Sequence, residues 1–182
     1  MKPRSTGFSR FCLGAFVCLL AAGCGPPRDC IFYDKTNNCS LRVPGDWRAT
    51  QTIYMNAMKL YAPTADQLPF ITVGVVVNET QSLEEYTRML IRDAREKEGW
   101  QFLSQEKATL LGQPASRLIF RKPQVQAPPQ VFDSLFTIRN GTVYQLTLTV
   151  EESRHKENEA LFRKIAGSFR IGTQPMFSRD IF

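Results

Sequence analysis

The spacing of apolar and polar residues predicts a buried strand followed by a helix near the middle of the chain. The segment Phe70 to Val77 is apolar at almost every position, which is typical of a central strand covered on both faces. Beyond it, Ser82 and Glu85 have the spacing of a capping box, and Gly99 is expected to end the helix. The apolar face of this predicted helix comprises Leu83, Tyr86, Met89, Leu90 and Ala94.

After the helix the apolar period shortens toward two, which indicates strands. Four segments show this pattern, and the last two flank Asn140-Gly141. Asn-Gly favours a two-residue hairpin because a type I′ turn needs a positive φ at both positions. The four segments are Trp100 to Leu110, Pro114 to Arg121, Phe132 to Arg139 and Thr142 to Val150.

The hairpin turn also predicts which residues face each other. Pairing outward from Asn140-Gly141 places Leu135 opposite Leu146 and Phe136 opposite Gln145. Both faces of the hairpin then carry apolar side chains, so both need cover. The stretch from Pro123 to Pro129 is interpreted as an exposed loop.

The two ends of the domain are less regular. Leu41 to Trp47 predicts a short strand that ends at a Pro-Gly turn, with Trp47 packed on the core. A second amphipathic helix places Leu161, Phe162, Ile165 and Phe169 on one face. The order of strands, helix, four strands and helix predicts an α+β fold, in which an antiparallel sheet has helices on both faces as an α/β/α sandwich.

Composition supports one folded domain. The chain has 182 residues, of which 43% are hydrophobic and 22% charged. This length fits one domain of ordinary size plus a targeting segment. The composition excludes wholesale disorder and collagen-like repeats.

The N-terminus has the features of an export signal. Lys2, Arg4 and Arg10 precede the uncharged run from Phe11 to Leu20, which is too short for a membrane-spanning helix of about 20 residues. The following Leu20-Ala21-Ala22-Gly23-Cys24 resembles a bacterial lipobox. We therefore expect residues 1–23 to be a signal peptide and Cys24 to carry the lipid that anchors the chain to the membrane.

Five cysteines occur in the chain, and this reading accounts for each of them. Cys12 and Cys18 leave with the signal, and Cys24 is acylated. Cys30 and Cys39 remain in an oxidising compartment, where we expect them to form a disulfide. This bond would close a loop between the tether of residues 24–38 and the first residue of the domain. Their spacing, together with a single histidine, supplies neither a metal site nor a redox dithiol.

The positive charge is concentrated near the expected anchor. The chain has 23 Lys and Arg against 17 Asp and Glu, and loss of the three basic signal residues leaves 20 against 17. Arg28, Lys35, Arg42 and Arg48 follow Cys24 closely, so they are candidates for contact with anionic lipid headgroups. Aromatic residues fall on core positions rather than along a basic stripe, so a nucleic-acid partner is not expected.

Catalytic residues are not evident in the sequence. His155 is the single histidine, and its place near the start of the last helix is more typical of a solvated residue than of a general base. The adjacent carboxylates at Glu84-Glu85 and Glu151-Glu152 stand at helix entrances, where acidic residues stabilise the helix dipole. Glycine-rich phosphate motifs are missing, and no cofactor is expected.

Several short motifs together resemble the PsbP-like fold, which includes bacterial lipoproteins of the DcrB and LpqN kinds. The resemblance covers most of residues 39–171 and implies a scaffold for protein contacts without shared catalytic residues. The motifs are Val43-Pro44-Gly45-Asp46-Trp47, Ser82-Leu83-Glu84-Glu85-Tyr86, Leu111-Gly112-Gln113-Pro114-Ala115, Gly141-Thr142-Val143-Tyr144-Gln145-Leu146-Thr147 and Ile165-Ala166-Gly167-Ser168-Phe169.

The expected function is therefore contact rather than catalysis. The sequence predicts a PsbP-like domain over residues 39–171, a tail over 172–182, and a lipid-anchored protein that faces the periplasm and binds an envelope protein, as an accessory in envelope biogenesis or in a membrane complex. Gly25 after the anchor favours the outer membrane over the inner membrane. The alternative is a carrier or sensor of a small apolar ligand, which requires a cavity of about 300 Å³ or more.

Overall fold

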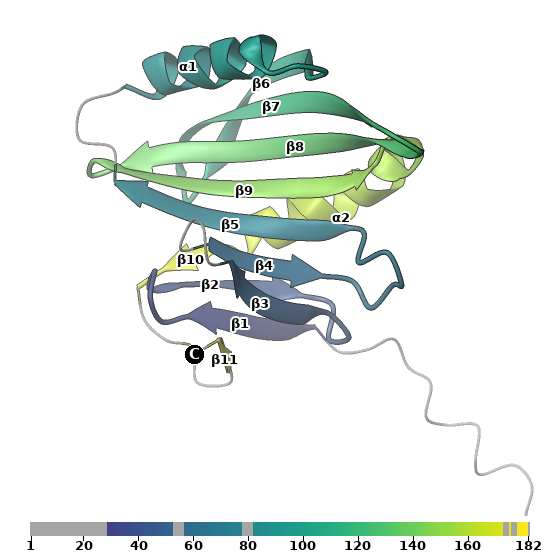
Figure 1. Ribbon diagram of the computed structural model, residues 1–182. Helices are drawn as coiled ribbons and strands as arrows, with labels where there is room; N and C mark the ends of the chain where they lie inside the picture. The colour runs from purple at the N-terminus through teal and green to yellow at the C-terminus, as the bar shows by residue number, and fades with distance from the viewer. Residues whose placement is uncertain (1–28, 53–56, 78–81, 173–174, 176–177, 182) are drawn as a thin grey trace, which may run out of the picture.

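A computed structural model describes residues 29–52, 57–77, 82–172, 175 and 178–181 (Figure 1). Cys24 and Arg28 lie outside these residues. Within the described part, the strands form two sheets, and two α-helices pack on them. None of the helices described is long and apolar enough to cross a membrane.

The larger sheet is antiparallel and has the order β3-β4-β5-β9-β8-β7-β6. Its strands are β3 (Arg48–Thr52), β4 (Ala57–Tyr61), β5 (Phe70–Val77), β6 (Gln101–Leu110), β7 (Gln113–Gln124), β8 (Ala127–Arg139) and β9 (Thr142–Glu151). The smaller sheet has the order β10-β2-β1-β11, with strands β1 (Cys30–Asp34), β2 (Cys39–Val43), β10 (Arg170–Ile171) and β11 (Ser178–Ile181). The smaller sheet and α1 (Leu83–Glu96) lie at opposite ends of the molecule (Figure 1).

The predicted start of α1 is confirmed in detail. The Ser82 Oγ accepts a hydrogen bond from the Glu85 backbone N–H at 3.2 Å, and the Glu85 carboxylate accepts one from the Ser82 backbone N–H at 2.8 Å. This reciprocal pair satisfies two backbone donors that a helix start leaves free. The chain reverses after the helix at Gly99, where φ is +77°.

The predicted β8–β9 hairpin is also confirmed. Asn140 and Gly141 both have positive φ, at 50° and 69°. Leu135 faces Leu146 and Phe136 faces Gln145, as pairing outward from the turn predicts. A two-residue turn fixes the register because it leaves no extra residue by which one strand could shift against the other.

The predicted loop from Pro123 to Pro129 is wrong for most of its length. Strand β7 continues through Pro123 and β8 already begins at Ala127, so the turn itself is short. The β7–β8 register shifts between Lys122 and Gln124. A proline cannot donate to the sheet ladder and is tolerated at such an irregularity, which explains why Pro123 does not end the strand.

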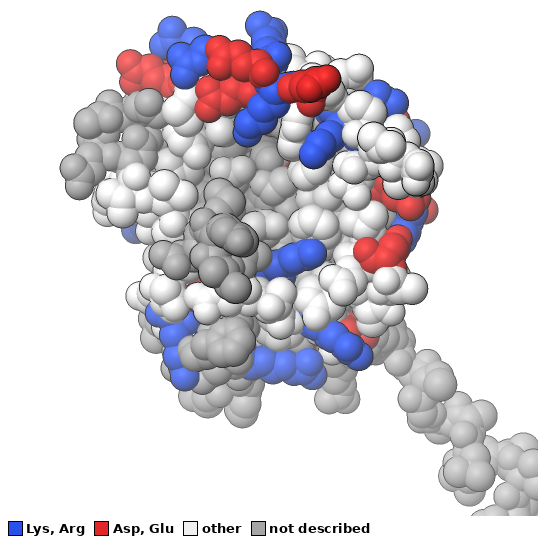
Figure 2. All heavy atoms as spheres, viewed as in Figure 1, with Lys and Arg blue, Asp and Glu red and all other residues white. Residues whose placement is uncertain are grey.

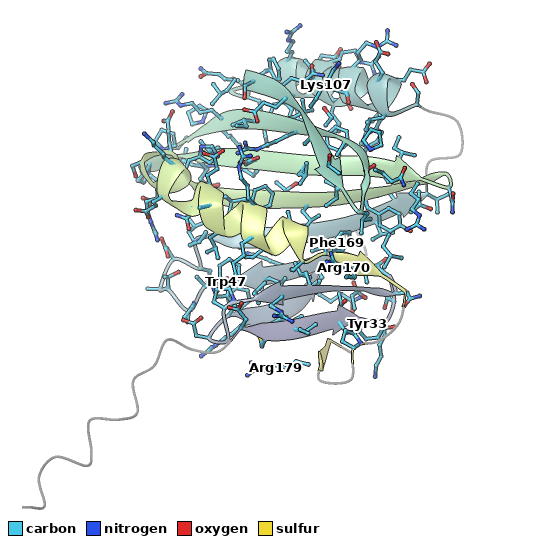
Figure 3. All side chains as sticks on the ribbon, turned by 180° about the vertical axis from the view of Figure 1, so that it is seen from behind. Tyr33, Trp47, Lys107, Phe169, Arg170 and Arg179 are labelled. Carbon is cyan, nitrogen blue, oxygen red and sulfur yellow. The ribbon has the colours of Figure 1, made fainter. Side chains whose placement is uncertain are left out.

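Two hydrophobic clusters hold the helices against the larger sheet. Helix α1 packs with Leu118, Phe120, Phe136 and Val143. Helix α2 (His155–Gly167), which follows a short 3₁₀ turn η1 (Glu152–Arg154), packs with Leu135, Leu146, Leu148 and Val150. In the reverse view, α2 crosses the sheet and leads to Phe169, and Trp47 lies near the smaller sheet (Figure 3). Trp47 is buried in the second cluster, which confirms its predicted core position.

The smaller sheet corrects both predicted boundaries of the domain. Strand β1 lies inside the segment interpreted as a tether, and β11 lies inside the segment interpreted as a tail. β1 pairs with β2 in antiparallel fashion and with β11 in parallel fashion. The buried Phe32 of β1 joins the main core, so the fold begins at about residue 30 rather than at residue 39.

The predicted Cys30–Cys39 disulfide is wrong for this structure, in which both cysteines are free thiols. In the β1–β2 hairpin, Cys30 faces Val43 and Cys39 faces Asp34. Four strand positions therefore separate the two cysteines, which corresponds to about 13 Å along the strand. A disulfide needs Cα atoms within about 7 Å of each other, so a bond between them would break the hairpin.

These thiols give a test in a chain that begins at residue 24 with the substitution Cys24→Ser. Burial, followed by the Asp34 charge, raises the pKa of Cys39 to about 12, and burial raises that of Cys30. We expect maleimide at neutral pH to leave Cys39 unlabelled and to react slowly with Cys30, because the thiolate is the reactive form. Both should react after unfolding. An intact mass lower by two hydrogens would instead establish the disulfide.

Charged side chains are unevenly distributed over the surface. Acidic and basic residues are interspersed over α1 and along one edge of the view, whereas basic residues predominate at the end that holds the smaller sheet (Figure 2). Basic residues at that end include Lys35, Arg42, Arg170 and Arg179. The two ends of the molecule therefore present different charge to their surroundings.

Candidate functional site

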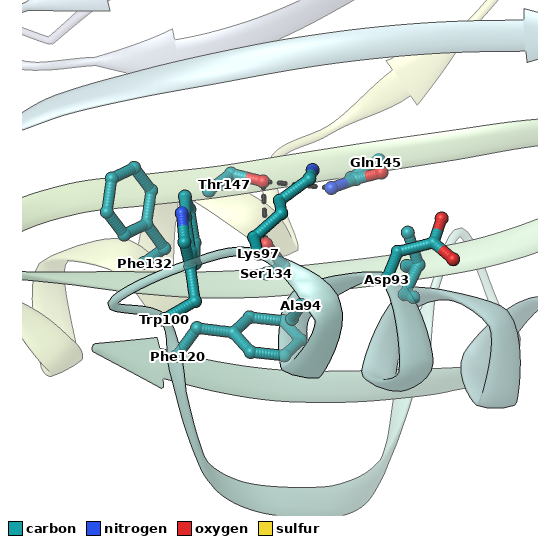
Figure 4. Close-up of a pocket in the computed structure, with 10 residues that line it drawn as sticks. Asp93, Ala94, Lys97, Trp100, Phe120, Phe132, Ser134, Gln145 and Thr147 are labelled. Carbon is teal, nitrogen blue, oxygen red and sulfur yellow. Dashed lines mark hydrogen bonds between the residues drawn. The ribbon is translucent and has the colours of Figure 1, made fainter. Parts of the chain in front are cut away.

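A pocket lies between the C-terminal half of α1 and the larger sheet (Figure 4). Its volume is about 310 Å³. We call it the α1 pocket. Its lining residues come from α1 and the segment that follows it and from β7, β8 and β9: Leu90, Asp93, Ala94, Lys97, Trp100, Phe120, Phe132, Ser134, Gln145 and Thr147.

Aromatic rings form one wall of the pocket. The Trp100 ring lies 4.7 Å from the Phe132 ring and 6.3 Å from the Phe120 ring, measured between centroids. Such offset and edge contacts stabilise the rings beyond their burial alone. Trp100 is brought there by the chain reversal at Gly99, which turns the chain back from the end of α1 onto the sheet.

The floor of the pocket is polar. The Ser134 Oγ and the Thr147 Oγ1 are 2.8 Å apart on neighbouring strands, and the Gln145 amide Nε2 donates to Thr147 Oγ1 at 3.1 Å. These three side chains alternate with the buried apolar residues of β8 and β9. They present hydroxyl and amide groups to the space above them, as Figure 4 shows.

Two lysines give the aromatic wall a positive rim. The Lys97 Nζ is 5.9 Å and the Lys122 Nζ 5.6 Å from the centre of the Trp100 ring, within the range of cation–π attraction. The site thus offers an apolar wall, a hydrogen-bonding floor, and charged groups of both signs at its edge, since Asp93 lines it together with Lys97. Such a surface suits an amphipathic group, whether a side chain of a partner or a small molecule.

Of the four basic residues predicted to face the membrane, Arg28 lies outside the described residues, and the other three come from separate parts of the fold. Lys35 lies in the β1–β2 turn and Arg48 begins β3, both exposed. Arg42 lines a different hollow with Lys164 and Arg170. The sequence pattern could not place these last two beside Arg42, because they come from α2 and β10, far along the chain.

A buried charge network was not predicted from the sequence. Arg117 Nε donates to Asp133 Oδ1 at 2.8 Å, and its Nη2 contacts Asp133 Oδ2. The Arg117 Nη1 binds Glu106 and Glu159 at 3.1 and 2.9 Å. His155 Nε2 lies 3.0 Å from Asp133 Oδ2, so the interpretation of His155 as a solvated residue is wrong.

The groups of the network stabilise one another's charged forms. Burial raises the pKa of Asp133, but hydrogen bonds from Arg117 and His155 outweigh burial and hold that pKa below its usual range. The groups that contact Arg117 and Asp133 are carboxylates, a guanidinium and an imidazole. Among the described residues, no hydroxyl or thiol that could act as a nucleophile contacts Arg117 or Asp133. Nor do these residues contain a group of three or more His, Cys, Asp or Glu that could hold a metal ion.

Comparison with known proteins identifies the fold to which this chain is similar. No family model matches the chain, and no curated protein matches it. Among solved structures, the cyanobacterial PsbP of Synechocystis superposes with a TM-score of 0.60 at 16% identity, over 82% of this chain and 95% of its own. The chain has a PsbP-like fold.

Two further structures with this PsbP-like fold are similar to the chain. The Ran-binding protein Mog1p of Saccharomyces cerevisiae has a TM-score of 0.57 at 11% identity, over 84% of this chain and 100% of its own. LpqN of Mycobacterium tuberculosis, described as involved in cell envelope biogenesis, has a TM-score of 0.54 at 16% identity, over 74% and 83%. The resemblance expected from the sequence motifs is thereby confirmed at the level of the fold.

Proposed function

We propose that the chain is a non-catalytic lipoprotein of the bacterial cell envelope that binds a protein partner through the α1 pocket. Cys24 carries the lipid, residues 1–23 are removed as a signal peptide, and the domain faces the periplasm. The outer membrane is favoured because Gly25 follows the anchor. The partner belongs to envelope biogenesis or to a membrane complex.

The α1 pocket is the observation that carries this proposal. Its aromatic wall and polar floor have the composition of interface hot spots, in which Trp and other large rings are enriched. The fold supports the same reading, since one PsbP-like neighbour is described as Ran-binding and another as involved in envelope biogenesis. Leu135 and Phe136 are consecutive on β8 and belong to different clusters, which supports a sandwich with one helix on either face.

The anchor is tested by the substitution Cys24→Ser. We expect the wild-type chain to incorporate labelled palmitate and to sediment with membranes, because a cysteine after a small-residue run is the acyl acceptor in the lipobox reading. The variant should lose the label and move to the soluble fraction. Cys18→Ser is the matched control and should change neither result. Palmitate labelling of the Cys24→Ser variant would exclude this attachment site.

The partner site is tested by photo-crosslinking in living cells. A photoreactive residue at position 97, on the rim of the pocket, is compared with one at position 88, on the exposed side of α1. We expect one discrete crosslinked species from position 97 alone. Adding Trp100→Ala should remove most of it, since loss of an anchoring tryptophan weakens interfaces by about 30-fold.

The crosslinking result depends on a control outside the pocket. Val125→Ala changes a side chain that is 92% exposed at the β7–β8 turn and should leave the yield from position 97 unchanged. Equal crosslinking from positions 88 and 97, or a yield that survives Trp100→Ala, would reject the α1 pocket as the partner site.

A second candidate function has a specific observation behind it. The α1 pocket volume of about 310 Å³ reaches the size needed to hold a small ligand, about 300 Å³. A carrier or sensor would release a small apolar molecule when the purified protein is extracted with organic solvent. A partner-binding protein would release none and would give the crosslink described above.

A further inference from the structure

A basic groove follows the C-terminal end of α2 on the side of the molecule seen in Figure 3, where Arg170 and Tyr33 are labelled. It consists of two hollows of about 440 and 470 Å³ that share Gly167 and Arg170. We define the basic groove by its four cationic side chains and two small residues: Arg42, Arg139, Lys164, Arg170, Gly167 and Ser168.

The groove carries more positive charge than its surroundings neutralise. No Asp or Glu is among the described residues that line the two hollows. Of the four cations, Lys164 pairs with the Asp29 carboxylate, whereas Arg42 and Arg139 are exposed and have no ion-pair partner among the described residues. Arg170 donates from Nη1 to the Gly167 and Phe169 carbonyl oxygens at 2.9 and 2.7 Å, so it meets no carboxylate there.

The groove is built on rigid parts of the fold. Ser168 accepts a hydrogen bond from the Arg42 backbone N–H at 2.9 Å and donates from Oγ to the Ile165 carbonyl oxygen at 2.6 Å. These bonds fix β2 against the end of α2. Arg170 pairs with Ser40 in the smaller sheet. The backbone that carries Arg42 and Arg170 is therefore held in place by the fold itself.

The groove also lies beside the point where the chain leaves toward Cys24. The Lys164 Nζ donates to the Asp29 carboxylate at 2.9 Å. Cys24 precedes Asp29 by five residues, and an extended chain of that length spans at most about 18 Å. A lipid on Cys24 would thus hold the edge of the groove within that distance of the membrane surface.

We propose that the basic groove holds the phosphate-bearing headgroup of an anionic phospholipid in the membrane to which Cys24 is attached. This inference rests on the proposed anchor and goes beyond it by giving the domain an orientation. Arginine presents N–H groups in a fork that matches phosphate oxygens. Because α1 and the smaller sheet lie at opposite ends of the molecule (Figure 1), the α1 pocket then points away from the bilayer.

The test uses a chain that begins at residue 24 with Cys24→Ser, which retains every described residue and has no acyl group. Its binding is measured by cosedimentation with vesicles of equimolar phosphatidylglycerol and phosphatidylcholine, and with vesicles of phosphatidylcholine alone. We expect binding to the anionic vesicles only. It should weaken as salt is raised, because exposed charges are screened.

Matched variants test whether binding depends on the basic groove or on positive charge in general. Arg42→Gln with Arg139→Gln removes two groove cations and should weaken binding by about 10-fold or more. Arg88→Gln with Arg92→Gln removes two exposed cations from α1 and should change binding less than about 2-fold. Thermal unfolding of each variant checks that the fold is retained, and Lys164→Gln provides an independent variant if the double change unfolds the chain.

Three results would overturn the inference. They are equal binding to neutral vesicles, equal effects of the two double variants, and displacement from the vesicles by inorganic phosphate at constant ionic strength, which would indicate a free phosphate ligand. The anchor is tested separately, because palmitate labelling of the wild-type chain depends on Cys24 and not on the groove. A labelled chain whose groove fails this test would refute the headgroup site alone.

Discussion

Replacing Asp133 by alanine is expected to lower the free energy of unfolding by about 3–5 kcal/mol. The Asp133 side chain is fully buried and the Arg117 side chain is only 6% exposed. Loss of the carboxylate leaves two guanidinium N–H groups of Arg117 buried without an acceptor. Glu106 and Glu159 still contact the Arg117 Nη1, but the cost of burying a charged group that has lost its fully buried partner is much larger than that of the intact pair. Urea unfolding followed by circular dichroism measures the change.

A double variant distinguishes the loss of one charge from the loss of the pair. Arg117→Met with Asp133→Leu removes both ionic groups and fills their place with apolar atoms, so it should be less destabilised than Asp133→Ala. Arg163→Ala is a control, since it removes an exposed partner of Glu159 and should cost less than about 1 kcal/mol. A stability for Asp133→Ala near that of wild type would show that Arg117 does not depend on Asp133.

The same network predicts a pH dependence. Because the pKa of Asp133 is lowered in the native state, its contribution to stability is complete above the ordinary aspartate pKa of about 3.9 and is lost as pH falls through the lowered native value. The difference in free energy of unfolding between wild type and Asp133→Asn should therefore shrink below about pH 4. A difference that stays constant in that window would contradict the assignment.

Replacing Phe136 by alanine is expected to cost about 3–5 kcal/mol of unfolding free energy. Phe136 is fully buried in the cluster beneath α1, and its ring contacts the Tyr86 ring edge to face at 5.4 Å. The substitution removes a large side chain and leaves a cavity that the rigid β8 backbone cannot close. Because Tyr86 belongs to α1, the change also loosens the helix that covers the α1 pocket.

Two comparisons test the reason for this loss. Phe136→Leu retains most of the apolar volume and should cost much less than Phe136→Ala, whereas Val125→Ala at the exposed β7–β8 turn should stay within about 0.5 kcal/mol of wild type. Fluorescence of Trp100 in a Trp47→Phe background, where it is the remaining tryptophan, should shift with Phe136→Ala. Unchanged fluorescence would show that α1 stays in place without Phe136.

Local rules predicted the parts of the fold that depend on neighbouring residues. The Ser82–Glu85 capping box and the Asn140-Gly141 turn each specify a conformation within a few residues, and both are confirmed. The β1–β11 pair could not be predicted in this way, because its two strands come from opposite ends of the chain. The expected disulfide was wrong because nearness in sequence does not mean nearness in the fold. Cys30 and Cys39 lie at opposite ends of the β1–β2 hairpin.

The sites were harder to predict than the fold. Arg117 on β7 contacts Asp133 on β8. This contact could not be predicted, because the interpretation of Pro123 to Pro129 as a loop left the register of β7 against β8 undefined. The α1 pocket depends on where α1 rests on the sheet, which periodicity does not specify. Trp100 nevertheless carried a signal, because it directly follows Gly99, and a glycine shortly after a helix favours a chain reversal that places the next side chain back over the helix end.

The parallel pair of β1 and β11 has a consequence for the order in which the chain can fold. β1 pairs with β11, which is synthesised after every other described strand, and β2 pairs with β10, which precedes β11 directly in the order of described strands. Until those residues emerge, both outer edges of the β1–β2 hairpin expose unpaired backbone groups, which are templates for misassembly. Synthesis of β10 and β11 therefore protects the edges of β1 and β2, and a truncation before Ser178 would leave the outer edge of β1 without its partner strand.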